Sequence, residues 1–438
     1  MASTATVSPV STQAQERPPA LPPGPRLPFY LQSYLNWQHM VPFLSWAQRR
    51  YGDVFTLRIL PWGRAIVIAD PELIKEIVTG PAEVFQAGAS NRGLLERVVG
   101  SRGLLTIDDE EHMATRKRML PPFHGESVRA YEQIVREMTE QRVAQWPIGE
   151  TISMHRESRE VTLEVILRAV FGAEDSRWLP ELRQALRRVT HITFLVSLWA
   201  AWPRLGVAPP WRGYAAAVDR TNELIDELID ERRDEGNLEE RTDILSLLLR
   251  AGENDPAWLR DQVMNLLLAG HETTTTGLSW AVLLLAQNPD VQARAREGDD
   301  AYLDAVVTET LRLRTVIPGV TRRLSEPATV GPYRFPAGVT LLGGSLLLHR
   351  DPRLYDAPEE FRPERWLDER PGTYTWFPFG GGRRRCIGAA FAQLEMRVAL
   401  RTILAHAEFR PARRRPERQR NFHITLIPSH RAQIVRTA

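Results

Sequence analysis

Residues 377–392 read Phe377-Pro-Phe-Gly-Gly-Gly-Arg-Arg-Arg-Cys-Ile-Gly-Ala-Ala-Phe-Ala392, and this stretch contains Cys386, the only cysteine of the chain. A lone cysteine excludes an internal disulfide, a Cys-x-x-Cys redox pair and a multi-thiolate zinc or iron-sulfur site. A buried structural thiol is the common alternative, because free cysteine usually packs as a small hydrophobic residue. The flanking residues favour a single-point ligand instead.

The glycines before the cysteine, residues 380–382, let the backbone adopt positive φ and approach a flat partner closely. Residues 389–400 have helical spacing, so Cys386 is expected at a loop-to-helix junction, where unpaired amides and the helix dipole favour a thiolate. A phosphate-binding loop is the competing interpretation. It requires Gly-Lys-Ser/Thr, whereas this chain continues Gly-Arg-Arg-Arg.

The pattern Phe379-x-x-Gly382-x-Arg384-x-Cys386-x-Gly388 resembles the haem-ligand signature of the cytochrome P450 family. The resemblance implies that Cys386 is the proximal thiolate ligand of the iron of haem b, where it favours cleavage of an O–O bond, and that Phe379, Arg384 and Gly388 also bind the cofactor. It further implies a mainly α-helical, single-domain fold with small β-sheets. The haem would lie between a long oxygen-side helix and the loop and helix that carry the cysteine.

The longest run of apolar residues with helical period extends from Asp255 to Ala286. Its middle contains Gly270 and four consecutive threonines, residues 273–276, which are poor helix formers. A weak place in an otherwise good helix indicates a functional site. A metalloprotease motif is excluded, because H-E-x-x-H would require histidine where Thr275 stands.

The segment Ala269-Gly270-His271-Glu272-Thr273-Thr274 resembles the acid-alcohol segment of the same family. By this resemblance Ala269 and Gly270 adjoin the haem and Gly270 leaves room for dioxygen. Glu272 and Thr273 would be the catalytic residues that relay protons to the reacting oxygen. This chemistry needs a hydroxyl to organise water and an acid to resupply the proton.

His112 and Arg116 are four residues apart on a predicted helix over residues 110–120 and, taken alone, indicate two solvated side chains. The wider pattern, from His112 through Lys117 to Phe123, resembles the family segment in which histidine and arginine bind the haem propionates. Arg322 resembles a further propionate-binding arginine, with Arg323 as the alternative.

Glu309 and Arg312 are three residues apart on a predicted helix over residues 301–313. A surface ion pair is the simpler interpretation of such a pair. The spacing also resembles the family's second signature, and Arg365, in the segment Phe361-Arg-Pro-Glu-Arg-Trp366, would complete a buried network that holds the haem loop.

The remaining pattern predicts a disordered tail and proline-rich lead-in over residues 1–26 and one haem domain over residues 27–438. Residues 85–105 are expected to be irregular and, by the resemblance, to lie over the haem. The other predicted elements are a hairpin at 54–59 and 65–68, helices at 41–51, 71–79, 128–145, 158–171, 182–201 and 214–234, and a terminal hairpin at 422–427 and 432–435. By the resemblance, the helices at 182–201 and 214–234 form a lid over the substrate cavity, and Phe194, Leu198 and Trp199 of the first helix favour a lipophilic substrate.

Composition is that of a soluble globular protein, with 43% hydrophobic and 25% charged residues and a net charge of +2. The near-neutral charge argues against a nucleic-acid partner despite arginine clusters at 383–385 and 410–420. No signal peptide or membrane anchor is expected, because the longest apolar stretch, 192–202, is about half of the ~20 residues that a spanning helix needs. We therefore expect a cytoplasmic protein.

The resemblance implies a monomeric monooxygenase that uses dioxygen on a lipophilic small molecule. Because the sequence contains no flavin or iron-sulfur segment, the electrons would come from a separate ferredoxin or flavodoxin and its reductase. Residues 116–118 and 383–385 are candidates for the docking face. A peroxide-driven peroxygenase and a non-catalytic haem-thiolate sensor remain the alternatives.

Overall fold

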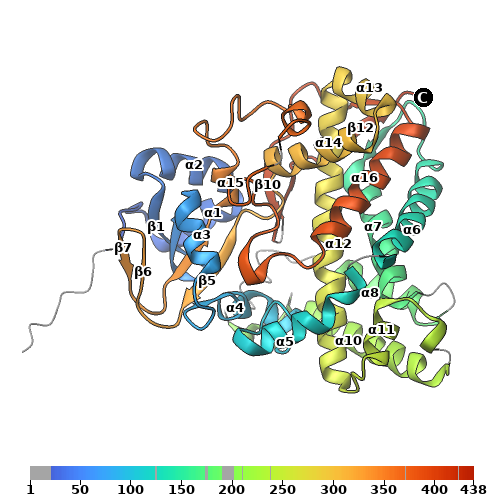
Figure 1. The fold of residues 1–438 in the computed structure, drawn as a ribbon, viewed down its shortest axis with the longest axis horizontal. Coiled ribbons are helices and arrows are strands. Elements are labelled where there is room, and N and C mark those ends of the chain that lie inside the picture. Colours follow the sequence, from blue (N-terminus) through green and yellow to red (C-terminus); the bar gives the residue numbers. More distant parts are fainter. Residues whose placement is uncertain are drawn as a thin grey trace, which may run out of the picture.

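The computed structural model describes residues 21–123, 126–172, 176–189, 202–209, 211–236, 238–369, 371–422 and 424–438. It is mainly helical with small sheets, as predicted (Figure 1). In this view the largest sheet lies on the left with α1–α3, and the long helix α12 runs vertically through the helices on the right.

The helices of the described chain are α1 (Phe29–Gln38), α2 (Met40–Tyr51), α3 (Pro71–Thr79), α4 (Ala87–Val99), α5 (Asp109–Met119), α6 (Glu126–Val143), α7 (Met154–Phe171), α8 (Leu179–Val189), α10 (Trp211–Asp234), α11 (Ile244–Arg250), α12 (Pro256–Gln287), α13 (Pro289–Glu297), α14 (Asp300–Leu313), α15 (Ser345–Leu348) and α16 (Ala389–His406). The helices predicted from periodicity are confirmed with shifted ends. Residues 190–201 of the predicted lid helix, including Phe194, Leu198 and Trp199, lie outside the described residues.

The strands are β1 (Val54–Ile59), β2 (Gly63–Ile68), β3 (Phe85–Gln86), β4 (Thr151–Ser153), β5 (Val320–Leu324), β6 (Ala328–Val330), β7 (Tyr333–Phe335), β8 (Thr340–Gly343), β9 (Phe409–Pro411), β10 (Gln419–Phe422), β11 (Thr425–Pro428) and β12 (Gln433–Arg436). The largest sheet has the order β1-β2-β8-β5-β3. The predicted hairpin β1–β2 is confirmed, and β2 pairs in parallel with β8, with Ala65 opposite Thr340. The sheet therefore joins segments far apart in the sequence and brings β5 into its interior.

Helix α12 is the centre of the helical part. It begins as the sequence predicts, because the Asp255 carboxylate accepts hydrogen bonds from the amides of Ala257 and Trp258 and Pro256 occupies the first turn. Helices α4, α7, α10, α14 and α16 pack against it. Almost every residue from Gln262 to Ala286 is buried, so α12 is a core helix as well as a candidate site helix.

The prediction that residues 85–105 form an irregular connection is wrong, because most of these residues form α4. The first turn of α4 is capped from a distance. The Asp108 carboxylate accepts from the amides of Gly88 at 2.6 Å and Ala89 at 2.7 Å. A Cβ at Gly88 would lie 2.5 Å from the Ile107 carbonyl oxygen, so this glycine allows close packing. A cap twenty residues later is invisible to a local sequence pattern.

The C-terminal strands also differ from the expectation. Strands β10 and β11 form a hairpin with each other, whereas β12 pairs with β4 and β9. The expected pairing of residues 422–427 with 432–435 is therefore wrong. Strand β12 thus completes a sheet with β4 and β9, which precede it in the sequence, and tertiary packing determines this pairing.

The packed chain begins before Leu27. The Pro22 carbonyl accepts a hydrogen bond from the Thr56 hydroxyl at 2.6 Å, and the Pro23 carbonyl accepts from the Thr56 amide at 3.0 Å. Part of the lead-in assigned to residues 1–26 is thus attached to β1, while residues 1–20 lie outside the described residues. Among the described residues, no helix has the length and apolar character required to cross a bilayer.

Candidate active site

The loop that carries Cys386 is fixed against α3. Gly380 and Gly382 have φ values of 65° and 62°, as the glycine run predicts. A Cβ at Gly382 would lie only 1.9 Å from the Val78 carbonyl oxygen, so its close partner is the backbone of α3. The Cys386 amide donates to the Phe379 carbonyl at 2.9 Å, and α16 begins after Gly388. These contacts set the direction of the cysteine side chain.

Cys386 is exposed to solvent, although protein atoms surround its thiol closely. Burial raises the pKa of the thiol, whereas the Gly388 amide, Arg116 and Arg385 act in the opposite direction. The Gly388 amide thus favours the thiolate, as the helix junction predicts, but burial outweighs its effect. A further positive charge, such as a metal cation, would be needed to hold the sulfur in its anionic form.

Helix α12 presents one accessible strip. Between Gln262 and Ala286, Ala269, Gly270 and Thr273 are the residues that are not fully buried, and their spacing places them on one face. The Thr273 hydroxyl donates to the Ala269 carbonyl at 2.5 Å, which orients the hydroxyl oxygen. Helix α12 packs against α16, the helix that follows the Cys386 loop. Gly277, one turn beyond Thr273, meets α16, because a Cβ there would lie 2.9 Å from the Met396 sulfur.

Glu272 lies off this strip and is buried against α7. Its Oε1 atom is 3.5 Å from Nε2 of His155, and neither carboxylate oxygen has a hydrogen-bond partner in the described chain. Gly270 also contacts α7, because a Cβ there would lie 2.9 Å from Cδ1 of Ile166. The space at Gly270 is thus limited by α7. No sequence signal had singled out His155.

A cationic cluster of four residues, His112, Arg116, Arg322 and Arg384, lies beside the loop. His112 is buried, and burial lowers the pKa of its imidazole to about 3, with Arg384, Arg116 and Arg322 acting in the same direction. The imidazole is therefore neutral at pH 7. His112, Arg322 and Arg384 also line one pocket together with Asp108. Residues from three separate motifs are thus brought to one place.

Strand alternation separates the two candidate arginines of β5. Arg322 is buried, and burial first, then Arg384, lowers the pKa of its guanidinium to about 10. Arg323 points to the opposite face and is exposed. Arg322 is therefore the arginine that lines the pocket.

Arg384 makes a different set of contacts from those expected. It donates to Asp108 Oδ1 at 2.8 Å and to the carbonyls of Leu104 and Ile107. It therefore ties the cysteine loop to the segment that caps α4. By contrast, no carboxylate of the described chain is hydrogen-bonded to Arg116 or Arg322, so the cluster holds positive charge that suits an anionic group. Asp108 was not identified from the sequence, although its position just before α5 is typical of a helix cap.

Arg116 connects the cluster to the thiol. It lowers the pKa of His112 by repulsion, and it interacts electrostatically with Cys386. The Cys386 thiol can bind a metal, and the arginine and histidine side chains of the cluster can bind carboxylates. A single cofactor that carries both a metal and carboxylates could therefore contact the thiol and the cluster together. This combination of donors fits haem, whose iron takes a thiolate and whose two propionates take arginine and histidine.

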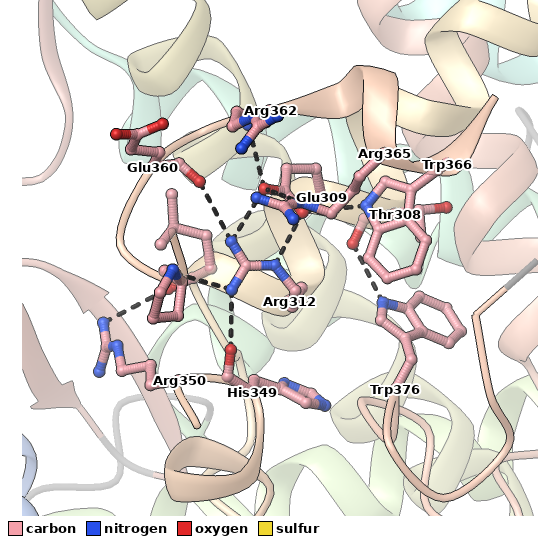
Figure 2. Close-up of polar contacts among 12 residues, drawn as sticks. Thr308, Glu309, Arg312, His349, Arg350, Glu360, Arg362, Arg365, Trp366 and Trp376 are labelled. Carbon is pink, nitrogen blue, oxygen red and sulfur yellow. Dashed lines mark hydrogen bonds and ion pairs between the residues drawn. The ribbon is translucent and has the colours of Figure 1, made fainter. Parts of the chain in front are cut away.

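The predicted Glu-Arg-Arg network is present (Figure 2), with Glu309 and Arg312 buried and Arg365 partly buried. Arg312 donates to both carboxylate oxygens of Glu309 at 2.8 Å, and Arg365 Nε donates to Glu309 Oε1 at 3.1 Å. The Trp366 indole and the Arg362 amide complete the shell of donors around Glu309. Arg312 satisfies its remaining N–H groups on the carbonyls of His349, Pro358 and Glu360. The Glu309–Arg312 pair is thus fully hydrogen-bonded and rigid, whereas Nη2 of Arg365 has no hydrogen-bond partner among the described residues.

His349 joins this network to the cysteine loop. Its carbonyl accepts from Arg312, while its ring Nε2 accepts from the Phe377 amide at 2.8 Å. Burial lowers the pKa of the ring to about 3, so the ring is neutral, and Nδ1 carries the proton toward the Thr315 hydroxyl. The Trp376 indole adds a second link, to the Thr308 carbonyl (Figure 2). Neither link was predicted from the sequence.

Known proteins resemble the whole chain. The family model Cytochrome P450 matches residues 18–435. "Putative cytochrome P450 135B1" of Mycobacterium tuberculosis (strain ATCC 25618 / H37Rv) is 39% identical over 429 residues, which cover 94% of this chain and 91% of the relative. Two solved structures share the fold. The crystal structure of CYP175A1 from Thermus thermophillus has a TM-score of 0.74 at 28% identity, and the match covers 93% of this chain and 97% of that one.

The second, "Retinoic acid bound cyanobacterial CYP120A1", has a TM-score of 0.82, covers 95% of this chain and 99% of its own, and at 24% identity bears on the fold alone. The family model and the Mycobacterium relative extend over nearly the full length, including the cysteine loop, α12 and the Glu309 network. The chain therefore belongs to the cytochrome P450 family of haem-dependent monooxygenases.

Proposed function

We propose that this cytochrome P450 binds haem b through Cys386 and the cationic cluster and inserts one oxygen atom from dioxygen into a lipophilic small molecule. When bound, the haem supplies the iron chemistry that activates dioxygen, and a cysteine thiolate adds electron density to that iron. The observation that carries the proposal is that the loop bearing Cys386 lines, through Arg383 and Arg384, the same pocket as His112 and Arg322. Because Cys386 is the only cysteine, no thiol remains for covalent attachment, which favours haem b.

In this proposal the loop and the cluster hold the two ends of the cofactor. The amide of Gly388 and the bond from the Cys386 amide to Phe379 stabilise and orient the thiolate. Arg116 and Arg322 bind the propionates by charge-assisted hydrogen bonds, and neutral His112 donates its ring N–H. Arg384 adds positive charge while remaining attached to Asp108.

Proton supply is assigned to α12. The Thr273 hydroxyl is oriented by its bond to Ala269 and faces the accessible strip, where it would organise water beside the reacting oxygen. Glu272, one residue earlier, would return protons to this water. The strip of Ala269, Gly270 and Thr273 carries no charge, which favours an apolar substrate.

The electrons are proposed to come from a separate ferredoxin or flavodoxin. Lys117, Arg383 and Arg385 are exposed, and Arg385 lies within electrostatic range of the thiol, so an acidic carrier would be attracted to this side. Arg118 contributes less than the sequence suggested, because it pairs with Glu253 at 2.8 Å. A monomeric, cytoplasmic enzyme remains part of the proposal.

The direct test is the spectrum of the reduced carbon-monoxide complex of the haem-loaded protein. The Cys386→Ser variant is expected to lose the thiolate-type spectrum, and its retention would contradict the assignment of the ligand. Product formation should require dioxygen and a reductant. Equal rates with peroxide alone would support the peroxygenase alternative, and failure of every spectrally binding compound to accelerate reductant use would support the sensor.

A further inference from the structure

A buried polar seam runs between α7 and α12. On α7 it consists of His155, Ser158 and Thr162, which lie on one face because they are three and four residues apart. On α12 it consists of His271, Glu272 and Thr275. All six side chains are buried. Such a seam is costly unless its polar atoms are hydrogen-bonded.

The half of the seam around Thr162 is mostly satisfied, and His271 Nε2 is its one side-chain atom without a hydrogen-bond partner among the described residues. The Thr162 hydroxyl bonds to His271 Nδ1 at 2.9 Å and to the Thr275 hydroxyl at 2.7 Å. Burial lowers the pKa of His271 to about 3, so this ring is neutral. These contacts join the two helices and fix the position of α12 next to Glu272.

The other half is not satisfied by protein atoms. In the described chain His155 Nε2, Ser158 Oγ and both oxygens of Glu272 have no hydrogen-bond partner, although His155 Nε2 lies 3.5 Å from Glu272 Oε1. Buried polar atoms that cluster in this way are normally bridged by ordered water. This half of the seam therefore has the polar partners that a short water chain requires.

The seam lies between the N-terminal end of α7 and the accessible strip of α12. His155 is the second residue of α7, its neighbour Arg156 is exposed, and the Phe422 ring packs edge-on against the imidazole at 5.9 Å between centroids. At the other end Glu272 precedes Thr273, which belongs to the strip. A proton entering at His155 thus has Glu272 as its next acceptor.

We propose that His155, with water held between it, Ser158 and Glu272, is a positioning residue that conducts protons from the surface at the start of α7 to Glu272. This inference rests on the relay role proposed for Glu272 and Thr273. Each turnover consumes one dioxygen, two electrons and two protons and yields the oxygenated product and one water. The electrons come from the redox partner and the protons from solvent, and His155 returns to its starting state after each transfer.

The test compares two ways of driving the haem-loaded protein on the lipophilic compound that binds most tightly in a spectral titration. With dioxygen and a reductant, His155→Gln is expected to lower product per electron about threefold to tenfold and to raise peroxide release. With hydrogen peroxide, which brings its own protons and electrons, the variant should match the wild type. An equal loss in both reactions would show a structural role and overturn the proposal, as would unchanged coupling with dioxygen.

A double variant separates this inference from the proposed function. If His155 acts through Glu272, adding His155→Gln to Glu272→Gln should cause no further loss of coupling. Unchanged coupling in Glu272→Gln itself would reject the relay. A loss in Glu272→Gln with none in His155→Gln would reject only the seam. His406→Gln, the same change at the end of α16, is the matched control and should behave as the wild type.

Two further observations complete the test. Glu395 of α16 is a rival buried acid, and burial raises the pKa of its carboxyl well above the ordinary value. If Glu395→Gln lowered product per electron and His155→Gln did not, protons would be supplied from α16, and the proposal would be overturned. A high-resolution crystal structure of the haem-loaded protein is expected to show ordered water bonded to both His155 and Glu272, and a dry seam would contradict it.

Discussion

The Arg312 guanidinium donates two parallel hydrogen bonds to the Glu309 carboxylate, each at 2.8 Å, and neither side chain is exposed to solvent. A charged pair in such a position is stable only because every remaining donor and acceptor finds a partner. Through His349 the same pair is connected to the Phe377 amide at the start of the cysteine loop. The network therefore supports the loop and takes no direct part in chemistry.

Replacing Arg312 by leucine should strand the buried Glu309 carboxylate and lower the free energy of unfolding by about 3–5 kcal/mol. Urea unfolding of the haem-loaded protein measures this loss. Arg136→Gln, which removes an exposed ion pair with Glu132, is the matched control and should cost about 1 kcal/mol or less. Similar losses for the two variants would show that the Glu309 network contributes no more than a surface pair.

Arg322→Gln should weaken haem retention, because it removes a charge-assisted hydrogen bond to a propionate. The expected effect is about tenfold or more in the rate of haem loss, measured by transfer to an apo-globin acceptor. Arg323→Gln changes an exposed neighbour on the same strand and should leave this rate unaltered. If the two variants lost haem at the same rate, the pocket assignment based on strand alternation would be wrong.

Thr273→Ala should uncouple electron use from product formation, since the hydroxyl that organises water on the accessible strip is lost. Product per electron is expected to fall by about tenfold, with more peroxide released. Thr273→Ser keeps the hydroxyl and should retain most of the coupling. Equal behaviour of the alanine and serine variants would argue that the hydroxyl has no part in proton transfer.

The buried histidines should make the protein sensitive to acid. The pKa of His349 falls from about 6.5 when unfolded to about 3 when folded, so the unfolded state binds the extra proton between these values. The stability contributed by the neutral ring is therefore present above about pH 6.5 and is lost as the pH falls toward 3. At about pH 5, each such ring should make the free energy of unfolding fall by about 1.4 kcal/mol for each pH unit of acidification.

Urea unfolding followed by circular dichroism at several pH values between about 6 and 4 would measure this slope. His349→Gln keeps an acceptor for the Phe377 amide, although its overall stability should be lower. It should reduce the slope of the free energy of unfolding against pH by the amount that one imidazole ring contributes. A slope equal to that of the wild type would show that His349 is already protonated in the folded protein.

The local sequence pattern was sufficient to predict those helices and strands whose caps, prolines and apolar period lie within or next to the element itself. The cap Asp255, the following Pro256 and the apolar period predicted α12 closely, and the alternation of β1 and β2 predicted their hairpin. It failed where a distant residue decides the structure. The distant Asp108 caps the first turn of α4, and β12 joins β4 and β9 in place of its sequence neighbours.

The sequence by itself determined the family resemblance, the single thiol and the residue types of the acid-alcohol and Glu-Arg motifs, because these depend on spacing along the chain. Only the tertiary structure decided that Arg322 faces the pocket, that Arg384 binds Asp108 and that His155 approaches Glu272. Contacts of this kind join residues tens to hundreds of positions apart. Their geometry is set by the packing of whole helices and strands, and a local pattern does not contain it.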